Sequence, residues 1–291
     1  MPDRDRTPIR PLGADCRPAI PVAALHGSAA SGRQWDGLAA HLGAEIRFVA
    51  PDLPGYGGSA AWPADNCASL QAKADRVSAL LVACGRPVHL VGHSAGGAVA
   101  VKIALGRPEL VASLTLIEPV LFHLLGGAGR GEKMLMQEVA LLAGIINASV
   151  ADGNPALGMA HFVNFWNGKG YWASLPAGKR IRLAAQCGQI VNDFAAAFAE
   201  DWPLAAASEL AMPVQLIMGL QSPLASLRVT EMLAETIDNA RLMVVPDAGH
   251  MAPFTHASIV NPMIARHVRL AEAGQALAAP VTTAAGGQRA A

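Results

Sequence analysis

The residues VHLVGHSAGGAVAVKIALG (88–106) carry the strongest structural signal in this 291-residue chain. Their first part, VHLVG (88–92), is a short apolar run that predicts a buried strand, and the part from residue 95 onward is apolar nearly throughout, which predicts a buried helix. Between the two stands Gly-x-Ser-x-Gly, with Ser94 at its centre. Glycines two residues either side of a serine let a strand and a helix approach closely. The stretch predicts a sharp strand–turn–helix unit that presents a serine hydroxyl at the edge of a sheet; the alternative is an ordinary turn of small residues.

Apolar runs and helical patterns alternate on both sides of this unit. Further strands are expected at IPVAALHG (20–27), IRFVA (46–50), SLTLIEP (113–119), PVQLIMG (213–219) and ARLMVV (240–245). Apolar residues at helical spacing predict helices over 69–84, 225–237 and 257–272. This alternation is typical of an α/β fold in which helices cover both faces of a parallel sheet.

Residues 120–210 interrupt the alternation, because they are helical in composition and contain no convincing strand. We therefore expect a helical cap insertion between two strands of the sheet. The predicted organisation is an N-terminal arm (1–19), a core (20–120 and 210–272), a helical cap (121–209) and a disordered Ala/Gly/Thr-rich tail (273–291).

Composition narrows the classes of partner. Lys plus Arg and Asp plus Glu number 22 each, so the formal net charge is zero, and neither nucleic acid nor a membrane is expected as a partner. The four cysteines form no CxxC pair, which predicts neither a metal site nor a disulfide framework. No signal peptide is evident, and no apolar run reaches the roughly 18 residues that a spanning helix needs. We expect a cytoplasmic protein that acts on a small molecule.

A serine hydroxyl becomes a good nucleophile only when a base takes its proton. His250 lies in VVPDAGHMAPF, just past the last predicted strand. This places its ring at the carboxyl edge of the sheet, where open α/β sheets bind their ligands. It also follows Ser94 in the order nucleophile, acid, histidine. We therefore predict Ser94 as nucleophile and His250 as base.

The developing oxyanion would need two hydrogen-bond donors. The N–H of Ala95 begins the helix, where the dipole is positive. The second donor is expected in the loop LHGSAASGRQW, and the N–H of Ser28 is the best candidate. The alternative for this loop is a plain glycine turn.

These segments together resemble the α/β-hydrolase superfamily. The matching pieces are LHGSAASGRQW, PDLPGYGGS, VGHSAGG, the insertion after SLTLIEP, and PDAGHMAPF, over roughly residues 20–270. The resemblance implies an eight-stranded, mostly parallel sheet with a helical cap over a buried pocket, and hydrolysis through an acyl-enzyme without a cofactor or metal. Members of this shape include carboxylesterases, lactonases and carbon–carbon bond hydrolases. Related epoxide hydrolases and dehalogenases use an Asp nucleophile, which Ser94 argues against.

The acid of the triad departs from the family pattern. The family usually places an Asp in the loop after the strand read here as PVQLIMG (213–219), and this chain has Ser222 there. Glu118 ends the strand SLTLI and precedes Pro119, which forces the chain out of the sheet at its carboxyl edge. Some family members place their acid after this strand, so we predict Glu118 as the acid. The alternatives are that Glu118 anchors the cap hinge, or that the enzyme is impaired.

The predicted cap contributes two apolar features. HFVNFWNGKGYWASLP (161–176) is rich in aromatic residues, which over a pocket favour an apolar acyl or alcohol group. MLMQEVALLAGIINASV (134–150) predicts a buried helix, or otherwise a tunnel wall, a homodimer interface or a membrane contact. The candidate pocket residues are Trp35, Phe162, Phe165, Trp166 and Trp172.

The sequence thus predicts a serine hydrolase that cleaves a carboxylic ester. A lactonase or carbon–carbon bond hydrolase with the same machinery is the alternative within enzymes. A ligand-binding member of the fold without catalysis is the alternative outside them.

Overall fold

The computed structural model describes residues 19–59, 69–127, 129–274 and 282–283. Its centre is a sheet of seven strands in the order β2-β1-β3-β4-β5-β6-β7, and every neighbouring pair is parallel. The strands are β1 (Ile20–Leu25), β2 (Ile46–Val49), β3 (Val88–His93), β4 (Val111–Ile117), β5 (Val214–Gly219), β6 (Ala240–Val245) and β7 (Thr282–Thr283).

The strand count corrects the expectation of eight strands, which came from the resemblance alone. Each predicted apolar run forms one strand, and β7 adds a two-residue edge strand beside β6. Within the described residues no strand is antiparallel. The central strands β3 and β5 are buried at every position, as a parallel sheet covered on both faces requires.

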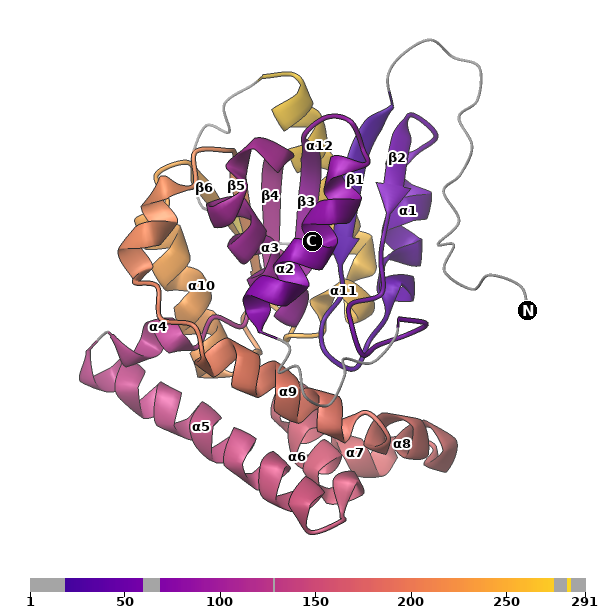
Figure 1. Ribbon diagram of the computed structural model, residues 1–291, viewed down its shortest axis with the longest axis vertical. Coiled ribbons are helices and arrows are strands. Elements are labelled where there is room, and N and C mark those ends of the chain that lie inside the picture. Colours follow the sequence, from indigo (N-terminus) through magenta and orange to yellow (C-terminus); the bar gives the residue numbers. More distant parts are fainter. Residues whose placement is uncertain (1–18, 60–68, 128, 275–281, 284–291) are drawn as a thin grey trace, which may run out of the picture.

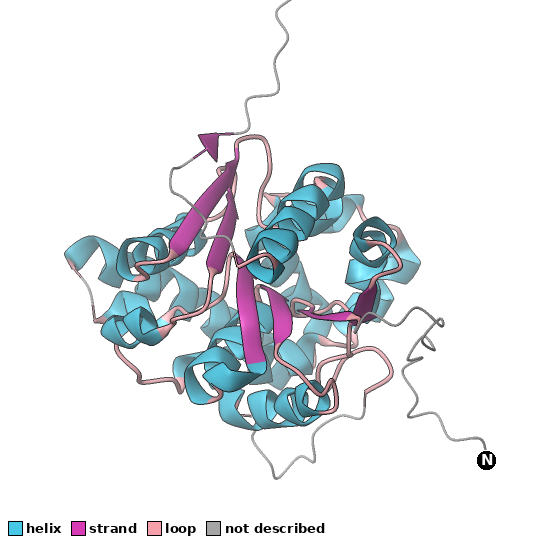
Figure 2. Cartoon of the chain, turned by 90° about the horizontal axis from the view of Figure 1, so that it is seen from above, coloured by secondary structure: helices cyan, strands magenta, loops and turns pink. Residues whose placement is uncertain are grey.

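Helices cover the two faces of the sheet, as the view from above shows (Figure 2). One face carries α1 (Asp36–Leu42), α11 (Ala252–Thr255) and α12 (Ala257–Glu272), and the other carries α2 (Leu70–Val82), α3 (Ala95–Gly106) and α10 (Leu224–Thr236). Strand residues alternate between the two cores: Val22 and Ala24 pack on the first face, Ala23 and Leu25 on the second. Short 3-10 turns lie at η1 (Gly32–Trp35), η2 (Pro108–Leu110) and η3 (Leu204–Glu209).

Six helices separate β4 from β5 and gather beyond one end of the sheet (Figure 1). They are α4 (His123–Gly126), α5 (Arg130–Ala151), α6 (Pro155–Asn167), α7 (Tyr171–Ser174), α8 (Ala177–Ala184) and α9 (Cys187–Phe198). We call α4–α9 the inserted helices. Helix α9 lies nearest the sheet, and α5 packs on both α6 and α9. These helices occupy the region of the predicted cap, and the domain boundaries drawn from the sequence stay predictions.

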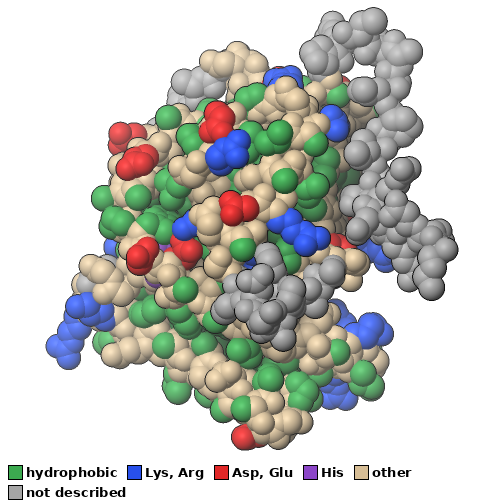
Figure 3. All heavy atoms as spheres, viewed as in Figure 1, with side chains coloured by type: hydrophobic (Ala, Val, Ile, Leu, Met, Phe, Trp, Pro, Cys, Tyr) green, Lys and Arg blue, Asp and Glu red, His purple; other side chains and the backbone are tan. Residues whose placement is uncertain are grey.

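Helix α5 corrects one expectation from the sequence. It is long and apolar enough to cross a membrane by length and composition, and no other helix of the described chain is. The polar pair Gln137 and Glu138 does not interrupt it. One face packs inward through Val139 and Ile146, whereas Met134 is exposed. A single helix of this kind is weak evidence for a membrane, and Figure 3 shows apolar side chains mixed with others over this part of the molecule.

The two ends of the chain fall largely outside this description. The predicted N-terminal arm lies outside the described residues except for Ala19. The predicted tail is described only at residues 273–274 and in β7. Cys84 and Cys187 are free thiols, and the other two cysteines lie outside the described residues.

Candidate active site

Ser94 stands at a sharp turn between β3 and α3. Its backbone has φ 55° and ψ −121°, in the region that side chains other than glycine rarely adopt. The turn depends on its glycines: a Cβ on Gly96 would lie 2.4 Å from the carbonyl oxygen of Leu25, and one on Gly92 would lie 2.6 Å from that of Gly96. The N–H of Ser94 donates to the carbonyl of Ile117 in β4, 3.0 Å away. Close packing against β1 and a hydrogen bond to β4 therefore both hold the strained turn in place.

Positive φ outside glycine is confined to three of the described residues: Ala29, Ser94 and Glu118. Ala29 lies in the loop after β1, Ser94 directly follows β3, and Glu118 directly follows β4, at the edge of the sheet where the inserted helices begin. Strain of this kind costs free energy and persists where the surroundings determine it, commonly at functional sites. All three positions border the predicted site.

His250 follows β6 and meets Glu118, which follows β4. His250 Nδ1 lies 2.7 Å from Glu118 Oε2. Both side chains are buried, with 2% and 0% exposure. A carboxylate beside Nδ1 keeps the proton on that nitrogen, which leaves Nε2 free to accept one. The structure thus joins the predicted base to the predicted acid.

The carboxylate of Glu118 receives four hydrogen bonds. Oε1 accepts from the N–H of Gly219 at 2.8 Å and from the hydroxyl of Ser222 at 2.6 Å. Oε2 accepts from the hydroxyl of Ser226 at 2.8 Å, besides His250. Burial by itself raises the pKa of Glu118, but the bond and charge of His250 and the other donors outweigh it and lower that pKa to about 2. Glu118 is therefore ionised at neutral pH.

Ser222 has a role that the sequence did not reveal. It occupies the position where the family usually carries the acid, and its hydroxyl donates to the acid that follows β4 instead. Ser226, four residues later on α10, does the same. The hydroxyls of Ser222 and Ser226 therefore both support the Glu118 carboxylate.

A second histidine links the site's loops. His93 Nε2 lies 2.9 Å from the carbonyl oxygen of His250, and its Nδ1 lies 3.1 Å from Gln34 Nε2. Burial, followed by the charge of His250, lowers the pKa of His93 to about 3, so the ring is neutral. It therefore donates from Nε2 to His250 and accepts from Gln34 at Nδ1. Gln34 Oε1 in turn accepts from the N–H of Gly27 at 3.1 Å.

The loop after β1 passes close to Ser94. A Cβ on Gly27 would lie 3.2 Å from the Cβ of Ser94, so the next residue, Ser28, reaches the serine's surroundings. Within the described chain, the amides of Ser28 and Ala95 donate to no protein acceptor. Both candidate oxyanion donors are thus available to a ligand.

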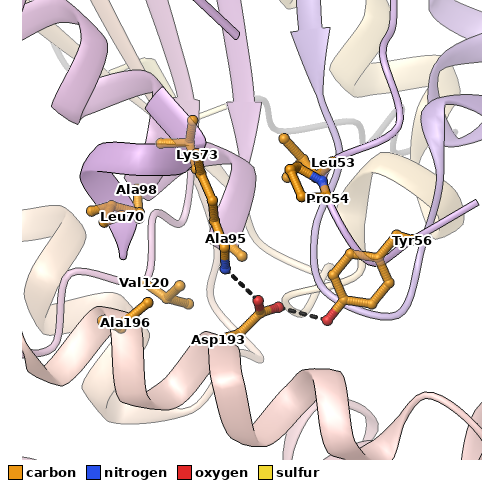
Figure 4. A pocket seen from close by; sticks show the side chains of 12 residues that line it. Leu53, Pro54, Tyr56, Leu70, Lys73, Ala95, Ala98, Val120, Asp193 and Ala196 are labelled. Carbon is orange, nitrogen blue, oxygen red and sulfur yellow. Dashed lines mark hydrogen bonds and ion pairs between the residues drawn. The ribbon is translucent and has the colours of Figure 1, made fainter. Parts of the chain in front are cut away.

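Two small cavities of ≈ 20 Å³ each adjoin the site. The aromatic cavity is lined by Ser28, Ser94, Val120, Phe122, Phe162, Trp166, Ile190, Asp193, Phe194 and Ala197. The polar cavity, drawn in Figure 4, is lined by Leu53, Pro54, Tyr56, Leu70, Lys73, Ala95, Ala98, Val99, Val120, Asp193, Ala196 and Ala197. Each has room for about one water molecule.

Trp166 of α6 packs on the ring of His250. Its ring stacks on His250 with 3.7 Å between centroids and an interplanar angle of 22°. It also lines the aromatic cavity with Ser94. Trp166 therefore contacts His250 and also lines the cavity beside Ser94. Among the described residues no hydrogen bond joins the Ser94 hydroxyl to His250, whereas His250 and Glu118 are hydrogen-bonded.

The predicted pocket residues divide into two groups. Phe162 and Trp166 line the aromatic cavity, and Phe165 reaches it only through an edge contact with Trp166 at 4.8 Å. Trp35 and Trp172 line neither cavity. Trp35 ends η1, so its side chain turns into the core under α1 and α12 on the other face of the sheet, while Trp172 packs at the rim of the inserted helices.

Six residues that line the aromatic cavity were missed from the sequence: Val120, Phe122, Ile190, Asp193, Phe194 and Ala197. Five of them have apolar character as their only sequence signal, which core residues share, and Asp193 stands in no motif. Among the described residues no group of three or more His, Cys, Asp or Glu side chains could hold a metal ion.

Comparisons with known proteins bear on the family and the fold. The sequence profile of the alpha/beta hydrolase family matches residues 22–261. Lipase LipV of Mycobacterium tuberculosis is 46% identical over 99 residues, which are 34% of this chain and 36% of that lipase. The chain spans between 35% and 41% of the length of the first three curated relatives that it matches.

Solved structures share the fold. An esterase of Thermogutta terrifontis, solved with malate bound, has a TM-score of 0.68 at 21% identity, over 87% of this chain and 90% of that esterase. The enol-lactonase of Burkholderia xenovorans LB400 has a TM-score of 0.68 at 16% identity, over 86% of this chain and 92% of that enzyme. At such identities the likeness shows the fold alone.

Proposed function

Because this chain belongs to the alpha/beta hydrolase family, we propose that it is a serine hydrolase that cleaves the carboxylic ester of a small, largely apolar substrate. The observation that carries this proposal is the buried pair of His250 and the ionised Glu118, placed at the edge of the sheet where Ser94 holds its strained turn. Such a pair has a use beside a serine nucleophile, and burying it without one would only lower stability.

The reaction follows from the positions of these groups. Ser94 Oγ attacks the ester carbonyl carbon while His250 Nε2 takes the hydroxyl proton. The carbonyl oxygen becomes an oxyanion, which the N–H groups of Ser28 and Ala95 stabilise. The C–O bond to the alcohol then breaks, and His250 returns the proton to the leaving alkoxide. Water, activated by the same histidine, cleaves the acyl-enzyme and restores Ser94.

Glu118 serves this cycle without exchanging a proton. Its Oε2 holds Nδ1–H at 2.7 Å and stabilises the imidazolium that forms after proton transfer. Since the pKa of Glu118 is about 2, the carboxylate stays charged at neutral pH.

The aromatic cavity supports an apolar substrate. Phe122, Phe162, Phe194 and Ile190 surround the space next to Ser94, and such walls favour an apolar acyl or alcohol group. That space has room for about one water molecule. We propose that the inserted helices act as a cap, which shifts to admit the ester.

A lactonase or a carbon–carbon bond hydrolase would use the same three residues, so these remain the alternatives within the family. The structural likeness to an enol-lactonase concerns the fold. A ligand-binding protein without catalysis is the alternative outside enzymes, and the hydrogen bond of His250 to the buried carboxylate of Glu118 argues against it, because binding alone does not need a histidine oriented as a base.

Hydrolysis of p-nitrophenyl esters of graded chain length tests the proposal. We expect turnover by the purified chain that depends on acyl length and disappears in Ser94→Ala. The matched control is Ser208→Ala, which removes an exposed serine hydroxyl on η3 and should leave kcat unchanged. If neither these esters nor simple lactones were hydrolysed by the folded protein, the proposed function would be wrong.

A further inference from the structure

Asp193 joins the inserted helices to the core through a buried polar cluster. It lies on α9, and Lys73 Nζ of α2 is 2.6 Å from its Oδ1. The hydroxyl of Tyr56 donates to Oδ2 at 2.6 Å, and the hydroxyl of Ser28 donates to the same oxygen. The side chains of Lys73 and Asp193 are only 6% and 9% exposed. Figure 4 shows the carboxylate between the lysine and the tyrosine.

The donors come from three separate parts of the core. Ser28 lies in the loop after β1, Tyr56 in the loop after β2, and Lys73 on α2. The fourth donor, Gln189 Nε2 at 3.2 Å, is on α9 itself. One carboxylate of the inserted helices therefore fastens α9 to three core segments at once.

Asp193 also lies where the chemistry is proposed to occur. It lines both cavities, the aromatic one with Ser94 and the polar one with Ala95. Its partner Ser28 carries the candidate oxyanion N–H, and the next residue, Ala29, has φ 57°. The strained loop that must present this N–H is thus held in place from the opposite side by a residue of the inserted helices.

Asp193 is not a second acid for the histidine. Each of its oxygens already accepts from two donors, and His250 Nδ1 is engaged by Glu118. Its effect on the reaction would pass through Ser28.

We propose that Asp193 is a positioning residue that couples closure of the inserted helices to assembly of the oxyanion hole. This inference rests on the proposed function. When α9 is seated, Asp193 holds the Ser28 hydroxyl, and the Ser28 N–H faces the oxyanion. When the inserted helices lift to admit substrate, the hydroxyl is released and the donor is no longer fixed. Bond cleavage is then efficient only in the closed state.

Ser28→Ala tests this coupling most cleanly, because it removes the tie and keeps the backbone N–H. Losing a whole oxyanion donor lowers kcat by about 10²–10³, so a misplaced donor should cost between about 10-fold and 100-fold. KM for a p-nitrophenyl ester should change by less than about 3-fold, since the contact strengthens in the transition state. Affinity for benzyl trifluoromethyl ketone should fall with kcat, because its adduct with an active serine carries an oxyanion.

Asp193→Ala should give the same pattern, and adding Ser28→Ala to it should cause no further loss, because the two residues act as one unit. Tyr56→Phe removes the other hydroxyl on the same oxygen and should lower kcat much less than Ser28→Ala. Asp152→Asn, an exposed acid at the end of α5, is the matched control with unchanged kcat.

The outcomes separate the coupling from a purely structural role. If Ser28→Ala and Asp193→Ala lower the melting temperature but leave kcat and ketone affinity unchanged, Asp193 is a structural tie and the inference is wrong. It is equally wrong if Ser28→Ala is impaired and a folded Asp193→Ala is not. Should Asp193→Ala fail to fold, the comparison of Ser28→Ala with Tyr56→Phe decides. An inactive wild-type chain would instead overturn the proposed function.

Discussion

Replacing Glu118 by glutamine should prevent His250 from acting as a base while leaving the fold in place. In Glu118→Gln the amide carbonyl will stay on the Oε1 side, because the Gly219 N–H and the Ser222 hydroxyl both donate there, at 2.8 and 2.6 Å. The amide NH₂ then takes the place of Oε2, which lies 2.7 Å from His250 Nδ1. Nδ1 must become an acceptor, so the ring proton moves to Nε2.

A histidine protonated at Nε2 cannot take the proton of Ser94. In the Ser-His-Asp template, replacing the acid by its amide lowers kcat by about 10⁴, or about 5 kcal/mol of transition-state stabilisation. Because the Gly219 N–H and the Ser222 hydroxyl both hold the amide oxygen on the Oε1 side, we expect a loss of this size here.

The assay is kcat on a p-nitrophenyl ester, read beside the thermal unfolding curve of each variant. Glu109→Gln, an exposed glutamate on η2, is the matched control and should keep wild-type kcat. The double variant Glu118→Gln/Ser222→Asp, which returns an acid to the usual family position, should recover part of the loss. A folded Glu118→Gln with kcat within about tenfold of wild type would refute the assignment of the acid.

Three further predictions concern the support of the site and the stability of the fold. Ser222→Ala should keep kcat within about tenfold of wild type. It should lower the free energy of unfolding, measured in urea, by about 2 kcal/mol, because it deletes one hydrogen bond to a charged group. A loss of activity like that of Ser94→Ala would instead give Ser222 a direct role in catalysis. Gly96→Ala should yield little folded protein in a circular-dichroism melt and lower the free energy of unfolding by about 3 kcal/mol or more, because its Cβ would lie 2.4 Å from the backbone oxygen of Leu25. A wild-type melting curve would contradict the close packing of the turn at Ser94. Burial lowers the pKa of His93 to about 3 and that of His267 to about 4, so between pH 6.5 and these values only the unfolded chain binds the two protons. The free energy of unfolding should be level above pH 7 and fall below pH 6.5 by about 1.4 kcal/mol per pH unit for each histidine. Urea unfolding that is unchanged from pH 7.5 to 4.5 would contradict this prediction.

The sharp turn at Ser94 between β3 and α3 could be predicted from sequence because its requirements are local. A strand, a helix and two glycines at fixed distances from Ser94 leave few other conformations. The position of Glu118 could also be predicted, since a carboxylate that follows a strand and precedes a proline is expected at the carboxyl edge of the sheet. Family membership is confirmed by the profile match over residues 22–261.

The parts that sequence could not give depend on contacts between distant segments. Trp35 stands in the loop predicted to border the pocket, yet one turn of η1 carries its ring to the other face of the sheet, and no pattern fixes that direction. Ser222 and Ser226 support Glu118 over more than 100 positions in the chain. Asp193 reads as an ordinary polar residue of a helix until the packing of α9 brings it to Ser28 and Lys73.

The strand count shows a different limit. Six apolar runs were visible and each forms a strand, whereas the number eight came from the resemblance. The expectation that no apolar run reaches the length of a spanning helix was wrong for α5, because its 22 residues remain apolar on average despite the polar residues among them.

The central claim is that His250, oriented by Glu118, activates Ser94. The most direct measurement is labelling by a fluorophosphonate at pH 7–8, with the modified residue located by peptide mass spectrometry, because such probes react only with an activated serine. The account predicts rapid modification of Ser94 in the wild-type chain, and labelling slower by orders of magnitude in Glu118→Gln. A folded wild-type protein that stays unlabelled, or one labelled at another serine, would contradict it.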